Sequence, residues 1–191
     1  MRVSHEGRCL AAPPRHGYAQ RVMSAAPATD REPQVRQDAA LFRARCADDR
    51  GDAALLLPAW SVDDWGALLA RARPHRLSSG EVLMRSGQAQ GSLFLLAEGA
   101  LDVRTGSAGA FGSLHHERPG AVIGEISFFD GGPRSATVWA TEPSRLLELD
   151  NASVLDFAAA HPARGQELLM ALARVLAGRV RRSEGRRNET L

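Results

Sequence analysis

Gly124-Glu125-Ile126-Ser127-Phe128-Phe129-Asp130-Gly131-Gly132-Pro133-Arg134-Ser135-Ala136-Thr137 is the stretch of this 191-residue chain that decides its fold. Glu125 follows a short apolar run, and the residues after it can form one helical turn whose free N–H groups point at an anion. Arg134 adds a planar guanidinium that matches phosphate oxygens. The stretch therefore predicts an anion-binding turn completed by Arg134.

Glu125 needs a different role, because a carboxylate is a poor phosphate ligand. A hydroxyl group that donates a hydrogen bond is its natural partner, and sugars carry such groups. A sugar hydroxyl beside a phosphate describes a nucleotide.

The same stretch resembles the phosphate-binding cassette of cyclic-nucleotide-binding domains. That module is shared by bacterial catabolite-activator-type regulators, cyclic-AMP-dependent kinase regulatory subunits and cyclic-nucleotide-gated channels. Its pattern, Gly-Glu-apolar-small-apolar-apolar, a turn and then Arg-small-Ala-small, is filled at every position. The glycine-punctuated segments 80–83, 86–87 and 93–99 extend the match. The resemblance spans about residues 60–182.

The resemblance assigns roles to the cassette residues. It implies that Glu125 accepts a hydrogen bond from the ribose 2'-hydroxyl and that Arg134 pairs with the cyclic phosphate. The backbone near Ile126, Ser127 and Ser135 would complete the phosphate shell. The expected binding residues are Gly124, Glu125, Ile126, Ser127, Arg134 and Ser135, with Val122 and Thr137 as further contacts to the base or rim.

Ser135 bears on the choice of base, because its hydroxyl can reach either a phosphate oxygen or an amino group on the base. In the family, a hydroxyl residue here is compatible with cyclic AMP in bacterial regulators, and threonine favours cyclic GMP in several eukaryotic members. Serine is compatible with both nucleotides, and we favour cAMP over cGMP as the ligand.

Short apolar segments separated by Gly, Ser and Pro predict seven strands, at about 82–85, 93–97, 101–104, 111–115, 122–123, 135–140 and 146–149. We expect a mainly β fold with flanking helices (α+β). Its centre would be a jelly roll, or double-stranded β-helix, with an N-terminal helix and C-terminal helices. The family resemblance implies the same roll.

We expect three parts along the chain. Residues 1–50 would be a disordered or partly helical extension, with at most a short helix near 38–46. Residues 51–183 would form the binding domain, with the roll at about 80–150 and helices at about 151–183. Residues 184–191 would be a polar tail. Ser61 begins an N-capped helix, which Pro74 ends.

The last predicted helix carries apolar residues at helical spacing, Leu169, Leu172, Leu176 and Val180. This stripe either packs wholly against the roll or forms the seam of a homodimer. The arginines from Arg179 to Arg187 are explained most simply as cations that complement the helix dipole.

Composition excludes several classes of protein. The net charge of +2 does not require a nucleic-acid partner, and every basic residue is Arg, which removes lysine-dependent phosphate and Schiff-base chemistry. Two cysteines are too few for a disulfide framework, so a cytoplasmic setting is expected. No apolar run reaches the roughly 18 to 20 residues needed to cross a bilayer, so no membrane partner is expected.

His115-His116-Glu117 resembles part of a metal site of the cupin type. Adjacent strand residues point to opposite faces, so both histidines cannot bind one ion inside a roll. A solvated hairpin edge is the better interpretation, and we expect neither a metal nor a cofactor.

The sequence therefore predicts a non-enzymatic sensor of cAMP or cGMP in bacterial signal transduction, acting on a protein effector that the sequence does not identify. Only a short tail follows Val180, so no DNA binding is expected from this chain alone. The alternative is a degenerate roll that binds no nucleotide and serves interaction or dimerisation, and it is attractive only if Glu125 and Arg134 pair with each other. A metalloenzyme is the third hypothesis.

Overall fold

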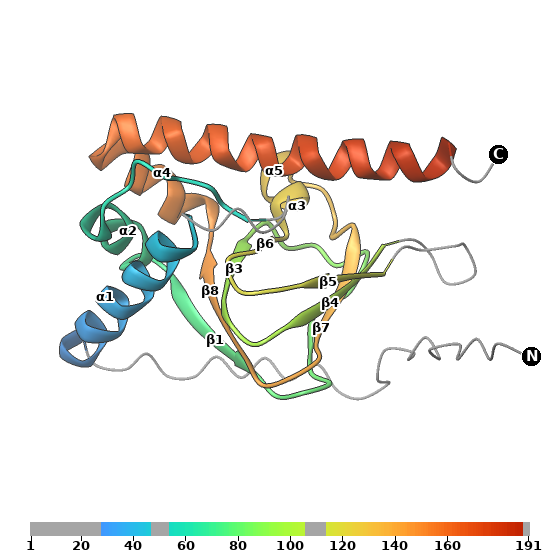
Figure 1. Cartoon of the computed structure of the whole chain (residues 1–191), viewed down its shortest axis with the longest axis horizontal. Coiled ribbons are helices and arrows are strands. Elements are labelled where there is room, and N and C mark those ends of the chain that lie inside the picture. The colour runs from blue at the N-terminus through green and yellow to red at the C-terminus, as the bar shows by residue number, and fades with distance from the viewer. Residues whose placement is uncertain (1–27, 47–53, 106–113, 189–191) are drawn as a thin grey trace, which may run out of the picture.

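Two antiparallel four-stranded sheets form the centre of the molecule, and helices cover one of them (Figure 1). The structure is a computed structural model that describes residues 28–46, 54–105 and 114–188. The first sheet has the order β1 (Arg73–Leu77), β8 (Ser144–Leu149), β3 (Leu93–Glu98), β6 (Val122–Ile123). The second has the order β2 (Val82–Met84), β7 (Ala136–Ala140), β4 (Leu101–Thr105), β5 (Leu114–Glu117). This arrangement confirms the predicted roll.

Two strands differ from the sequence prediction. β1 was not predicted, because Pro74 reads as a helix terminator. Proline lacks the N–H that a central strand must donate, but β1 is an edge strand, where proline is tolerated. The strand expected at 111–115 is observed as Leu114–Glu117, and its first expected residues lie outside the described ranges.

The first sheet is buried on both faces, which explains the unbroken apolar run of β3. Leu93 and Leu95 pack into a core shared with the helices, whereas Phe94 and Leu96 pack into the core between the two sheets. Alternate strand residues point to opposite faces, so one strand contributes to both cores. The molecule is thus built in three layers, with the helices outermost.

The helices around the roll begin at recognisable signals. α2 (Val62–Leu69) starts with the expected cap, and Ser61 and Asp64 form a reciprocal capping box. Asp150 caps α4 (Asn151–Ala160), and α5 (Pro162–Asn188) begins at the proline that ends α4. The short α3 (Glu125–Asp130) is the helical turn predicted within the cassette.

α1 (Ala28–Arg45) is longer than the helix expected near 38–46, and it is firmly packed. Phe42 is 2% exposed and stacks on Trp65 with ring centroids 5.3 Å apart. Asp38 is also buried, in an ion pair with Arg145 of β8. The length and packing of α1 could not be predicted from the sequence, because a buried carboxylate in a weakly amphipathic segment gives no periodic signal. Residues 1–27 and 47–50 of the expected extension lie outside the described ranges.

The apolar stripe of α5 packs only in part. Leu172 is buried and Leu176 half-buried, but Leu169 is 41% exposed and Val180 is 53% exposed. The alternative in which all four residues pack on the roll is therefore wrong. The buried face of the helix is made instead by Leu168, Ala171, Leu172 and Val175.

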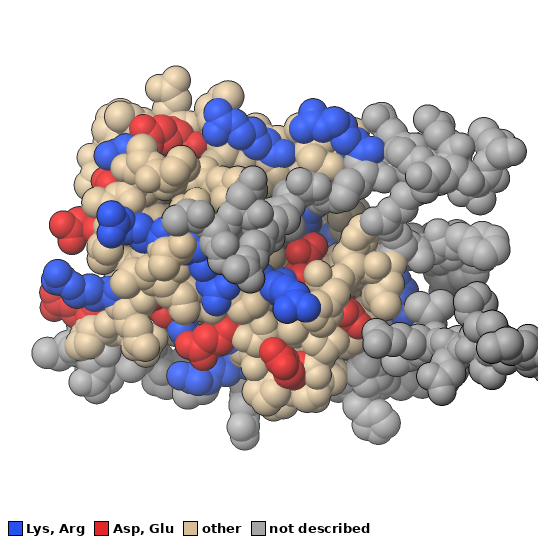
Figure 2. All heavy atoms as spheres, in the orientation of Figure 1, with Lys and Arg blue, Asp and Glu red and all other residues tan. Residues whose placement is uncertain are grey.

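Acidic and basic side chains are interspersed over the described part of the face in Figure 2. This agrees with the small net charge of the chain. Within the described ranges, no helix combines the length and apolar character that crossing a membrane requires.

Candidate functional site

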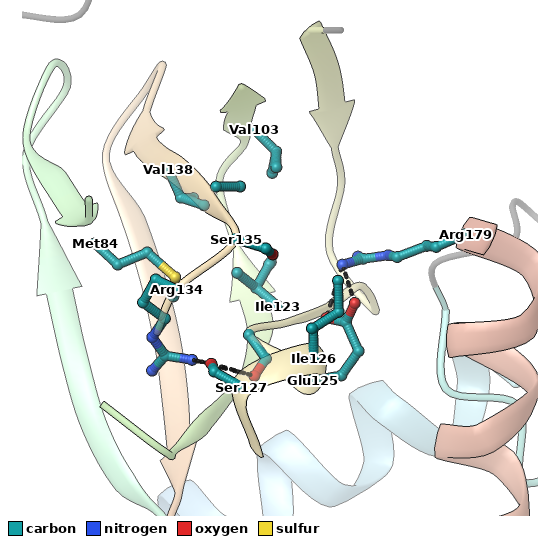
Figure 3. A pocket seen from close by; sticks show the side chains of 12 residues that line it. Met84, Val103, Ile123, Glu125, Ile126, Ser127, Arg134, Ser135, Val138 and Arg179 are labelled. Atoms are coloured by element: carbon teal, nitrogen blue, oxygen red, sulfur yellow. Dashed lines mark hydrogen bonds and ion pairs between the residues drawn. The ribbon is translucent and has the colours of Figure 1, made fainter. Parts of the chain in front are cut away.

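A small cavity lies where the cassette meets the roll. All six residues predicted to bind line it, namely Gly124, Glu125, Ile126, Ser127, Arg134 and Ser135. The rest of its wall is Met84, Val103, Ile123, Ala136, Val138 and Arg179 (Figure 3). The cavity therefore joins an apolar wall from the second sheet to the polar groups of the cassette, a composition typical of small-molecule sites.

Gly124 sets the geometry of the cassette. Its φ of +84° lies in the left-handed region, which favours glycine. A Cβ at this position would also overlap the guanidinium of Arg134. The glycine therefore allows both the sharp entry into α3 and the close approach of Arg134.

Arg134 is held firmly beneath the cassette. Its Nη1 donates to Ser127 Oγ at 2.7 Å and to the carbonyl oxygen of Gly124 at 3.1 Å. Its Nη2 donates to Ser92 Oγ at 3.4 Å, and its guanidinium lies over the ring of Phe94. The side chain is only 2% exposed, so these contacts fix its orientation at the edge of the cavity.

Glu125 has a partner from the far end of the chain. Nη1 of Arg179, on α5, donates to both carboxylate oxygens of Glu125 at 2.7 Å each. Nη2 of Arg179 donates to the carbonyl oxygen of Val122 at 2.6 Å and lies 3.5 Å from Glu117 Oε1. Interpreting Arg179 as a cation that merely complements the helix dipole is therefore wrong.

The two arginines approach α3 from opposite sides in Figure 3. Arg134 is held by hydroxyl and carbonyl oxygens, and Arg179 takes the Glu125 carboxylate. A direct Glu125–Arg134 pair was the condition that favoured the non-binding alternative, and the structure gives each of the two residues a different partner.

The remaining predicted residues differ in placement. Ser135 is exposed and faces the cavity, where a bound molecule can reach its hydroxyl. The side chain of Val122 is buried in the helical core, and Thr137 Oγ1 accepts from the Ser86 N–H at 3.1 Å. Neither Val122 nor Thr137 is among the residues that line the cavity.

Sequence reasoning missed the apolar wall and Arg179. Val138 could have been found, because it lies on the same strand as Ala136 with period-2 spacing. Arg179 could not, because it is 54 residues from Glu125 and nothing local distinguishes it from the other arginines of α5.

The cavity is small, with about 20 Å³ of space that water can occupy, and Arg179 forms part of its wall. The donor set fits a phosphate ester carrying a hydroxyl group. Arg179 is the wall residue that comes from outside the roll.

The histidine pair on β5 lies away from this site. His116 Nδ1 is 2.9 Å from Asp102 Oδ1, across the β4–β5 ladder. Among the described residues, no group of three His, Cys, Asp or Glu side chains is arranged to hold a metal ion.

Comparison with known proteins agrees with the fold and the cassette. Residues 74–161 match the family described as cyclic nucleotide-binding domain. A cyclic nucleotide-gated potassium channel of Mesorhizobium japonicum is 37% identical over 95 residues, which are 50% of this chain and 24% of the channel. A cyclic nucleotide-binding domain from Methylobacillus flagellatus has the same fold, with a TM-score of 0.68 and 21% identity over 84% of this chain and 85% of that domain. Residues 74–161, a little under half of the chain, thus carry the likeness to the cyclic nucleotide-binding domain family.

The chain spans only a small part of the curated relatives that it matches. Glutaminase 2 of Bradyrhizobium diazoefficiens is 30% identical over 125 residues, which are 65% of this chain and 19% of that protein. The matched regions are thus parts of longer proteins, one named as a potassium channel and one as a glutaminase.

Proposed function

We propose that this chain is a non-enzymatic sensor that binds a cyclic nucleotide and passes the signal to a protein effector. The observation that carries the proposal is the cavity itself. It brings Glu125, Arg134 and Ser135 together from α3 and the start of β7, against an apolar wall that suits a base.

Each group has a chemical role in this proposal. Arg134 neutralises the phosphate, with the N–H groups of Ile126 and Ser127 as additional donors. Glu125 accepts from the ribose 2'-hydroxyl. Ser135 meets either the phosphate or the base, and we propose cAMP as the preferred ligand and cGMP as the weaker one.

Isothermal titration of the whole chain with cAMP and with cGMP tests this function. We expect heat with both and tighter binding of cAMP. Absence of heat at high micromolar concentrations of both nucleotides would overturn the proposal. Exchange of Ser135 for Ala tests the base preference, since loss of the hydroxyl should narrow the difference between the two ligands.

The Arg134→Ala variant tests the phosphate contact. We expect binding to weaken by about 2 to 5 kcal/mol, because a buried phosphate charge loses its partner. Arg174→Ala is a matched control, since it removes an exposed arginine from α5 and should leave affinity unchanged. Equal affinity of Arg134→Ala and the parent chain would mean that other groups hold the phosphate.

A second candidate function is a degenerate roll that serves interaction and binds no nucleotide. The observation that favours it is that both oxygens of Glu125 bond to Arg179 of the same chain. The titration separates the two candidates, because only the sensor takes up ligand.

We also propose that α5 can mediate a homodimer. Its outer face exposes Leu169, Met170 and Val180 by 41%, 52% and 53%. Sedimentation of the chain and of Leu169→Glu should show a dimer for the parent and a monomer for the variant. The proposed setting is the bacterial cytoplasm, which agrees with the two cysteines of the chain.

A further inference from the structure

A buried carboxylate that the proposed site does not use lies close behind Arg134. Glu148 of β8 is 9% exposed and is paired with Phe94 of β3 in the ladder. Paired residues point to the same face of a sheet, and Phe94 packs in the core between the two sheets, so Glu148 points toward that core. A buried charge is costly unless its oxygens are hydrogen-bonded, so the partners of Glu148 indicate its role.

Two groups hold the carboxylate of Glu148 in place. His75 Nε2 of β1 lies 2.7 Å from Glu148 Oε2, and the hydroxyl of Ser92 forms a second hydrogen bond. Both hydrogen bonds lower the pKa of Glu148, His75 more than Ser92, so the carboxyl group is ionised at neutral pH. An ionised carboxylate only accepts hydrogen bonds, so Ser92 donates its single proton to Glu148. The lone pairs of the Ser92 oxygen are therefore left for another donor.

Arg134 is that donor. Its Nη2 donates to Ser92 Oγ at 3.4 Å, and Ser92 is only 4% exposed. Ser127 is oriented in the same way, since its hydroxyl donates to the carbonyl oxygen of Gly124 at 3.2 Å and accepts from Arg134 Nη1 at 2.7 Å. Two serine hydroxyls with fixed proton directions therefore set the orientation of the guanidinium.

The ring of Phe94 connects the same groups a second time. Arg134 Cζ lies 5.6 Å from the centroid of this ring, and the His75 ring meets it edge to face with centroids 5.6 Å apart. The groups that hold Glu148 therefore also support the guanidinium of Arg134 from the side of the first sheet.

We propose that Ser92 and Glu148 are positioning residues for Arg134: Glu148 fixes the direction of the Ser92 hydroxyl, and this hydroxyl fixes the guanidinium that meets the nucleotide phosphate. This inference rests on the proposed nucleotide-binding function. A guanidinium that is already oriented loses little freedom when the ligand binds, so its orientation strengthens binding. Neither Ser92 nor Glu148 is among the residues that line the cavity, so both would act on the ligand through Arg134.

Titration of the whole chain with cAMP tests the positioning role. Ser92→Ala should bind about five- to tenfold more weakly than the parent chain, because a charged donor loses one acceptor. Ser92→Thr keeps the hydroxyl and should bind nearly as the parent does. Ser144→Ala is the matched control, since it removes a buried hydroxyl of the same sheet that bonds to the backbone of Ala100 and Glu142, and it should leave affinity unchanged.

Double variants show whether these residues act through one another. Glu148→Gln should also weaken binding, because an amide donates as well as accepts and no longer fixes the Ser92 proton. Added to Ser92→Ala, it should cause no further loss of affinity, and Ser92→Ala added to Arg134→Ala should cause none either. Losses that multiply in both double variants would overturn the proposed order of action.

The NMR signal of the Arg134 guanidinium gives a readout that needs no ligand. The signal is assigned by its loss in Arg134→Ala. In ligand-free protein it should broaden or shift in Ser92→Ala and in Glu148→Gln, and it should stay unchanged in Ser144→Ala.

The outcomes separate this inference from the proposed function. If the parent chain binds cAMP, an unchanged affinity and an unchanged Arg134 signal in both Ser92→Ala and Glu148→Gln overturn the positioning role and leave the sensor intact. No heat from the parent chain overturns the nucleotide-binding function. An Arg134 signal that responds to both substitutions would then still support the orientation of the guanidinium by Ser92 and Glu148.

Discussion

Two helices from opposite ends of the described chain are each joined to the roll by an arginine–carboxylate pair, and the two junctions differ in burial. Asp38 of α1 meets Arg145 at 2.6 and 2.8 Å, with side-chain exposures of 3% and 6%. Arg179 of α5 meets Glu125 at 2.7 Å, with side-chain exposures of 19% for Arg179 and 1% for Glu125. Chemically similar pairs therefore stand in different surroundings.

The surroundings decide what each pair can do. The Asp38 pair lies next to Ala39 and Phe42, which are buried in the helical core, so α1 cannot leave without exposing apolar surface. Among the residues of α5 whose burial the structure describes, the last buried one is Val175, and Arg179 lies beyond it. The first junction lies within the core, and the second lies at its edge, with a buried carboxylate and a partly exposed arginine.

The largest expected effect comes from the apolar side of the α1 junction. Phe42→Ala should lower the free energy of unfolding by about 3 to 5 kcal/mol, because it leaves a cavity in the core beside Trp65. The matched change at the end of α5, Val180→Ala, should alter it by no more than about 0.5 kcal/mol. Chemical denaturation of the two variants measures both. If the two variants lost similar amounts of stability, the two junctions would not differ in the way proposed.

The next largest change in the free energy of unfolding should come from the Asp38–Arg145 ion pair of α1. Asp38→Ala should cost about 3 kcal/mol, because it leaves the buried Arg145 guanidinium with Glu98 as its remaining partner. Glu98→Ala provides a control on the same arginine. The Glu98 side chain is 55% exposed, so its removal should cost about 0 to 1 kcal/mol. If both variants lost the same stability, burial would not be the deciding factor.

The Glu148 carboxylate of β8 should make the stability of the fold depend on pH. The hydrogen bond with His75 holds the pKa of Glu148 below its ordinary value, with Ser92 and Arg73 contributing in the same direction. A lowered folded-state pKa stabilises the fold above the unfolded-state pKa, and this contribution is lost as the pH falls through the folded-state value.

Stability should therefore fall as the pH is lowered below the ordinary range of a glutamate, about 4.3. The Glu148→Gln variant should lose less stability than the parent chain as the pH falls. Denaturation curves at a series of pH values from neutral to acidic check this. If Glu148→Gln lost stability at low pH as steeply as the parent chain, other carboxylates would be responsible for the loss.

A further effect on stability is expected at Arg179. Arg179→Ala should lower the free energy of unfolding by about 1 to 3 kcal/mol, because it removes a partner of the buried Glu125 carboxylate while its own side chain is partly exposed. Denaturation would measure this, with Arg174→Ala as the control. A loss as large as that of Asp38→Ala would mean that the two ion pairs stabilise the fold equally.

The cassette and the roll were predictable because their signals are local. The cassette contains its glycine, acid and arginine within fourteen residues, and the strands are short apolar runs between turns. The missed elements lack such signals. β1 contains a proline that only an edge position permits, and α1 buries a carboxylate whose partner lies 107 residues away.

What the sequence by itself determined is the roll and the cassette residues that line one side of the cavity, because backbone conformation and side-chain chemistry at neighbouring positions fix them. Only the tertiary structure decided which arginine meets which carboxylate. Ion pairs carry no sequence spacing of their own, and they form wherever packed elements bring the charges within reach. The contact of Arg179 with Glu125 is set by the path of α5 across the roll (Figure 1), and with it the size of the cavity in this conformation.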